Sequence, residues 1–203
     1  LKHASKYLTS LSLVWFAKTF GDSPFVDVKP LGSFTKLKEL IIRAESGQYF
    51  DSNLKPPKVV KTLNCQALSR LVSLTKLTLR YMHIESIDFG FLKNLTNLQE
   101  LKVSNVQWRV PYDALKPLEC CTNITSLSLE LKETNSKVLQ CLKPLTQITS
   151  LVLSESLSDD YGLSVVAELT NLTKLSLFNS TSVDDNTVIH LTSLTNLQYI
   201  TLC

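Results

Sequence analysis

Glycine, histidine and long apolar runs are all scarce in this chain of 203 residues. Five glycines leave few places where the backbone could wrap closely round a phosphate. The three histidines, His3, His83 and His190, are far apart in the sequence. No Gly-x-Ser-x-Gly motif and no run of 18 apolar residues is present. We therefore expect a non-catalytic protein with no cofactor and no membrane span.

Charge and cysteine are similarly limited. The formal net charge is +3, which indicates neither a nucleic-acid-binding arm nor an acidic tail. The five cysteines match no zinc-binding spacing and lack the clusters that close many secreted repeat proteins. They are Cys65, Cys120, Cys121, Cys141 and Cys203. We expect no metal site and a reducing, cytoplasmic location.

Four Asn-x-Ser/Thr sequons leave a secreted or cell-surface location open. They begin at Asn94, Asn123, Asn171 and Asn179. Such a sequon accepts a glycan only in a secreted context, so these sites permit that location without arguing for it.

What the chain has in abundance is leucine at regular spacing. The clearest example is Leu92-x-x-Leu95-x-x-Leu98-x-x-Leu101-x-Val103. Spacings of three suit a tight helical or looped return, whereas the final spacing of two suits a β-strand whose side chains alternate between faces. One segment thus predicts a return across one face of the molecule followed by a short strand.

The same pattern occurs along nearly the whole chain. Further copies begin at Leu31, Leu68, Leu118, Leu142, Val166 and Leu191, and a shortened copy comprises Leu8, Leu11 and Leu13. Every pattern position is apolar or cysteine, and Cys121 occupies a leucine position. From Leu79 onwards the predicted strands end 24 to 26 residues apart. A period in the twenties built on Leu-x-x-Leu-x-Leu is the signature of a stacked repeat.

This pattern resembles the leucine-rich repeat superfamily. The resemblance implies an α/β solenoid, or horseshoe, of about eight repeats. Its parallel β-sheet would form the concave face, and short helices, 3₁₀ turns and loops the convex face. We expect residues 1–203 to form one such domain. Because Leu1 lies inside a repeat and Cys203 directly follows a strand, we also expect the chain to be part of a longer protein.

The last two complete returns place paired acids before an apolar segment. Asp159-Asp160 and Asp184-Asp185 are suited to cap the first turn of a helix. These segments resemble the cysteine-containing repeats of F-box substrate receptors. Ser156 and Ser180 stand where that subclass has cysteine.

Residues 44–62 form an insertion, because the strands ending at Ile42 and Leu79 are 37 residues apart. Insertions in solenoids project from one face and often serve binding, although a tolerated surface loop would have the same composition. Tyr49 and Phe50 are the aromatic residues of this segment.

Strand alternation predicts which residues face outwards on the concave side. Charge is concentrated on the second to fourth strands, next to the insertion. The candidate binding residues there are Glu39, Arg43, Lys76, Arg80, Tyr81, Glu100 and Lys102, together with Tyr49 and Phe50. Arginine and tyrosine are enriched at binding hot spots. The alternative is a solvated sheet face with weak cross-strand ion pairs.

These features favour a protein-interaction module that binds a protein partner on the concave face, mainly on its N-terminal half. The interleaved Glu39 and Glu100 argue against nucleic acid as the partner. We expect a monomer. Two alternatives remain open: the substrate-recognition arm of an F-box-type ubiquitin ligase, and the ectodomain of an extracellular recognition receptor.

Overall fold

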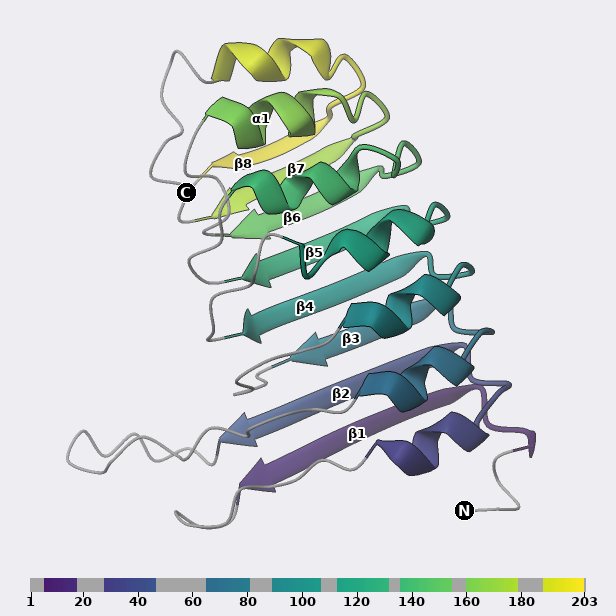
Figure 1. Ribbon diagram of the computed structural model, residues 1–203. Coiled ribbons are helices and arrows are strands. Elements are labelled where there is room, and N and C mark those ends of the chain that lie inside the picture. The colour runs from purple at the N-terminus through teal and green to yellow at the C-terminus, as the bar shows by residue number, and fades with distance from the viewer. Residues whose placement is uncertain are drawn as a thin grey trace, which may run out of the picture.

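A computed structural model describes eight segments of the chain and the way they stack (Figure 1). The described residues are 6–17, 28–46, 65–80, 89–106, 113–131, 136–154, 160–178 and 188–202. Each segment contributes one strand, and all but the first contribute a helical turn. Most of the insertion predicted at residues 44–62 lies outside these segments.

All eight strands belong to one parallel sheet, in which each strand pairs with its neighbours in sequence. The strands are β1 (Ser10–Ala17), β2 (Glu39–Ser46), β3 (Lys76–Arg80), β4 (Glu100–Val106), β5 (Ser126–Leu131), β6 (Ser150–Ser154), β7 (Lys174–Phe178) and β8 (Tyr199–Leu202). The order β1 to β8 confirms the predicted solenoid, because each repeat adds one strand beside the last.

The helical turns cover the opposite side of the sheet from the concave face (Figure 1). Six are 3₁₀ helices among the described residues, and one is an α-helix. They are η2 (Lys29–Ser33), η3 (Cys65–Arg70), η4 (Phe89–Asn94), η5 (Lys116–Cys120), η6 (Ser136–Leu142), α1 (Asp160–Ala167) and η7 (Ile189–Ser193). The helix expected after the pair Asp159-Asp160 is α1, which begins one residue earlier, at Asp160 itself.

The leucine spacing of three has a direct hydrogen-bond counterpart. The Leu95 N–H donates to the Leu92 carbonyl at 2.9 Å, and the Leu98 N–H donates to the Leu95 carbonyl at 3.0 Å. Bonds between residues three apart define 3₁₀ geometry, which places every third side chain on the same face. The spacing of three in the sequence thus turns successive leucines into the core.

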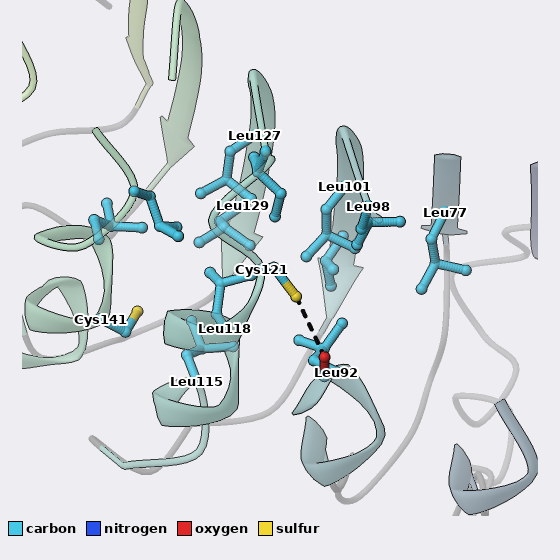
Figure 2. Close-up of a cluster of buried hydrophobic side chains, with 14 of the residues drawn as sticks. Leu77, Leu92, Leu98, Leu101, Leu115, Leu118, Cys121, Leu127, Leu129 and Cys141 are labelled. Carbon is cyan, nitrogen blue, oxygen red and sulfur yellow. Dashed lines mark hydrogen bonds between the residues drawn. The ribbon is translucent and has the colours of Figure 1, made fainter. Parts of the chain in front are cut away.

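The leucines of successive repeats pack into one continuous core (Figure 2). Within the strands, Leu101 and Leu127 are in register and each is 1% exposed. Figure 2 shows that Cys121 points into the same layer from the return before β5, and its Sγ donates to the Leu92 carbonyl at 3.3 Å. A cysteine can replace a leucine here because it is a small apolar side chain with a weak donor.

Polar side chains tie the repeats together at the surface. Asparagines before the strands donate from Nδ2 to a backbone carbonyl of the preceding repeat, at 2.8 to 2.9 Å. These asparagines, which we call the asparagine ladder, are Asn97, Asn123, Asn171 and Asn196. Threonine hydroxyls bond similarly, as in the contact of 3.0 Å from Thr173 Oγ1 to the Thr149 carbonyl. Backbone groups outside the sheet are thereby satisfied from one repeat to the next.

One local departure from strict alternation occurs in β4. Val103 pairs with Leu129, but the next pair is Val106 with Leu131, so β4 uses one more residue than β5 over this stretch. Alternation alone would place Ser104 on the concave face, whereas its side chain is only 4% exposed. An extra residue in one strand bends that strand and increases its local twist.

The asparagine ladder makes a testable contribution to stability. Asn123→Asp replaces the donor to the Thr96 carbonyl with an oxygen of the same size, and the two oxygens then repel each other. We expect the free energy of unfolding in urea to fall by about 1 kcal/mol. Asn94→Asp, which changes charge at an exposed asparagine outside the ladder, is the control. Equal losses in both variants would contradict the assignment.

The reactivity of the cysteines tests whether Cys121 is buried in the core. Burial raises the pKa of the Cys121 thiol to about 12, and the adjacent Cys120 thiol adds a smaller effect. Cys120 itself is exposed. We expect iodoacetamide to label Cys120 in the folded protein and Cys121 only after unfolding, as mapped by mass spectrometry. Labelling of both residues at the same rate in the folded protein would show that the return before β5 is open.

Candidate functional site

The sheet register brings six of the predicted residues together on the concave face of β2, β3 and β4. Glu39, Lys76 and Glu100 are aligned in a first row, and Arg43 is aligned with Arg80 in a third row. Lys102 belongs to the second row, beside Thr78. We call these residues the charged patch: Glu39, Arg43, Lys76, Arg80, Glu100 and Lys102.

Glu100 is the centre of the ion pairs in the charged patch. Its Oε1 lies 2.8 Å from Lys102 Nζ on the same strand, and its Oε2 lies 3.4 Å from Lys76 Nζ on β3. The hydrogen bond from Lys102 is the main reason that the pKa of Glu100 is lowered, against the opposing effect of its partial burial. Lys76 lowers it further. Glu100 therefore carries its charge at neutral pH and orders both lysines.

Glu39 is held at the N-terminal edge of the same row. The Ser10 hydroxyl on β1 donates to Glu39 Oε2 at 3.0 Å. Because Ser10, Glu39 and Lys76 follow one another in register and Glu100 comes next, the charges of this row alternate in sign from β2 to β4. Charged side chains of opposite sign on neighbouring strands attract, but at an exposed face each such pair is worth only about 0.2–1 kcal/mol.

Arg43 and Arg80 differ from the first row because two like charges are neighbours. They pair directly across β2 and β3, and both side chains are half-buried. Neighbouring strands lie about 4.8 Å apart, so the two arginines leave the sheet side by side. On β2 and β3 the third row therefore holds two basic side chains as neighbours.

Three of the predicted residues lie outside the described part of the chain. They are Tyr49, Phe50 and Tyr81. Their contribution to the site remains a prediction from the sequence.

A second set of side chains, at the C-terminal end of the concave face, was not among the predicted site residues. Phe178 on β7 is 37% exposed and Tyr199 on β8 is 63% exposed. Lys174 Nζ lies 5.3 Å from the centroid of the Tyr199 ring, within range of a cation–π contact. Both aromatics occupy outward positions of the strand alternation, so their exposure on the concave face could have been predicted. The prediction followed the concentration of charge on the second to fourth strands instead.

The described residues offer no alternative metal or membrane site. No group of three or more His, Cys, Asp or Glu side chains within them is placed to hold a metal ion. None of the helices that the structure describes is long and apolar enough to cross a membrane.

The convex side carries an ion pair of its own. Lys143 Nζ lies 2.8 Å from Glu168 Oε1, and this hydrogen bond raises the pKa of Lys143. Lys93 on η4 and Lys116 on η5 are exposed there on neighbouring repeats. They lie on adjacent convex turns, as Arg43 and Arg80 lie on adjacent strands, and so provide control positions.

Several solved structures are similar to this chain. Internalin C2 from Listeria monocytogenes is similar with a TM-score of 0.57 and 23% identity, over 85% of this chain and 74% of the internalin. The plant peptide hormone receptor RGFR1 in complex with RGF2 is similar with a TM-score of 0.57 and 18% identity, over 97% of this chain and 32% of the receptor. The Leptospira interrogans leucine-rich repeat protein LIC12759 has a TM-score of 0.55 and 16% identity, over 96% and 48% of the two chains.

These similarities and the eight-stranded sheet show that the chain has the leucine-rich repeat fold, a horseshoe solenoid with its parallel sheet on the concave face. No family model matches the sequence, and no curated protein does. The chain spans about a third of RGFR1 and about half of the Leptospira protein.

The Glu100 ion pairs predict a defined response to pH. Because its folded-state pKa is lowered, Glu100 stabilises the fold above its unfolded pKa, and this contribution is lost as pH falls through the folded-state value. Lys102→Ala should raise the pKa of Glu100 towards its usual value, as measured by NMR titration of the Glu100 carboxyl carbon. Lys116→Ala, on the convex side, should leave it unchanged. An unaltered Glu100 titration in Lys102→Ala would contradict the ion-pair assignment.

Proposed function

We propose that this chain is a non-catalytic protein-interaction module that binds a protein partner on its concave face, mainly through the charged patch. The observation that carries the proposal is the gathering of six charged side chains, from three strands, onto one surface of the sheet. The concave face of a solenoid is extended and is shaped before the partner arrives, so binding orders few main-chain groups.

The contacts within the charged patch support binding rather than catalysis. Glu100 is paired with two lysines and its pKa is lowered, so it is a poor proton donor at neutral pH. A general acid or base would need a pKa near the working pH and a nucleophile or second titrating group beside it. The charged patch is suited instead to fix the position and orientation of complementary groups on a partner.

The similar structures are consistent with a recognition role. RGFR1 is a plant peptide hormone receptor and was solved in complex with RGF2. The substrate-recognition arm of an F-box-type ubiquitin ligase and a receptor ectodomain would use the same kind of surface. They differ from a general interaction module in the identity of the partner, which a capture experiment reports.

Partner capture with matched variants tests the proposal. Arg43→Glu/Arg80→Glu reverses two charges on neighbouring strands of the concave face, and Lys93→Glu/Lys116→Glu reverses two on neighbouring convex turns. We expect a partner recovered reproducibly by the wild type and the convex variant to be reduced about ten-fold or more with the concave variant. Quantitative mass spectrometry of the captured proteins measures the difference. Circular dichroism must first show that both variants fold.

The reverse pattern is equally informative. A partner lost with the convex variant and retained with the concave variant would place the binding site on the helical side. The proposal that the partner binds the concave face would then be wrong.

A further inference from the structure

We propose that Asn94 is a site of N-linked glycosylation, at which an oligosaccharide is joined to the side-chain nitrogen on the convex side of the solenoid. The inference goes beyond the proposed function and does not depend on it. It requires the chain to enter the secretory pathway, a location that the four sequons leave open. It is carried by the different structural settings of the sequons in the described part of the chain. The fourth sequon, at Asn179, lies outside that part.

Two of the sequons are explained by the packing of one repeat on the next. The Nδ2 atoms of Asn123 and Asn171 each donate to a main-chain carbonyl of the preceding repeat, at 2.8 and 2.9 Å. The other members of the asparagine ladder, Asn97 and Asn196, make the same bond, but glutamine follows them two residues later, so they are not sequons. Asparagine is therefore used at this repeat position for the bond itself, whether or not a sequon results.

Asn94 stands at a different position of its repeat. It is the last residue of η4, whereas the ladder asparagine of the same repeat is Asn97. The Asn94 side chain is exposed, and its amide makes no hydrogen bond within the described residues. The sequon threonine, Thr96, is exposed as well. The fold therefore leaves the Asn94 amide open to solvent and gives it no part in joining the repeats.

Glycosylation uses the same nitrogen atom that the asparagine ladder uses. The sugar comes from a lipid-linked oligosaccharide. A bond forms between Nδ2 and the anomeric carbon, the bond from that carbon to the lipid diphosphate breaks, and Nδ2 loses one proton. At Asn123 and Asn171 the bulky sugar would be attached to an atom that donates to a main-chain carbonyl in the folded repeats. At Asn94 the added sugar displaces no such bond, so we expect this sequon to be the occupied one.

A glycan at Asn94 would leave the concave face clear. Asn94 ends η4, and the helical turns cover the opposite side of the sheet from the concave face (Figure 1). The oligosaccharide would thus project from the convex side, and the charged patch would stay accessible. The site is compatible with a protein partner bound on the sheet.

The cysteines do not oppose passage through an oxidising compartment. Of the four that the structure describes, only Cys120 is exposed, whereas Cys65, Cys121 and Cys141 are buried. Burial raises the pKa of the Cys121 and Cys141 thiols to about 12. These two thiols are therefore protonated at neutral pH, and a protonated thiol is a poor nucleophile for disulfide formation.

Mass spectrometry of the protein purified from the cells that make it tests the inference. Peptide N-glycosidase in water labelled with heavy oxygen converts a glycosylated asparagine into a labelled aspartate. We expect the label at Asn94, with an occupancy above that of Asn123 and Asn171. An unmodified Asn94 in this protein would overturn the inference. Equal occupancy of the three sequons would show that the asparagine ladder does not set the site.

Thr96 provides a matched pair of variants for the whole chain, secreted from cultured eukaryotic cells behind an added signal peptide. Thr96→Ser keeps the sequon and Thr96→Ala removes it, while both keep the main-chain carbonyl that accepts from Asn123. We expect the label at Asn94 to be retained in Thr96→Ser and lost in Thr96→Ala, with circular dichroism showing that both variants fold. Failure of the secreted wild-type chain to carry the label at Asn94 would also contradict the assignment.

Discussion

Every repeat of this chain can bury its leucines only against the repeats on either side of it. The effect is visible by comparing two aligned strands: Leu175 and Leu177 on β7 are almost completely buried, whereas their register partners on β8, Ile200 and Leu202, are 46% and 41% exposed. The side chains are equally apolar, and what differs is that β7 pairs with a strand on each side whereas β8 is at the edge of the eight-stranded sheet. Stability is therefore a property of adjoining repeats, since the interface between them is where apolar surface leaves water.

The same stacking determines what the concave face can do. Main-chain pairing holds Glu39, Lys76 and Glu100 in one row, and Arg43 and Arg80 in another, irrespective of the side chains themselves. Charges of opposite sign then compensate each other in the first row, while two of the same sign are forced together in the third. The register alone therefore decides which side chains are neighbours on this face, whatever their charge.

Much of this structure could be predicted from the sequence, because the leucine spacing of three indicates the return and the spacing of two indicates the strand. Leucines three apart predicted the helical or looped returns, and the final spacing of two predicted the strands and their concave rows. The extra residue in β4 could not be predicted, because nothing in the sequence marks where the register shifts. The sharing of Glu100 between two lysines also depends on side-chain conformations that periodicity does not encode. The exposed side chains of Phe178 and Tyr199 occupy positions that strand alternation predicts to face outwards, although neither was among the candidate binding residues.

The segment between β2 and β3 is much longer than the later returns, yet Glu39 still pairs with Lys76 in the register used by the other strands. The length of a return is thus uncoupled from the alignment of the strands it joins. In evolutionary terms, a return can gain or lose residues while the rows of the concave face keep their spacing. Duplication or deletion of a whole repeat would act differently, since it moves everything beyond it by one strand width of about 4.8 Å. Arg43 and Arg80 are thus separated from the exposed aromatic side chains of β7 and β8 by a whole number of strands. Selection can change that separation only by adding or removing whole repeats.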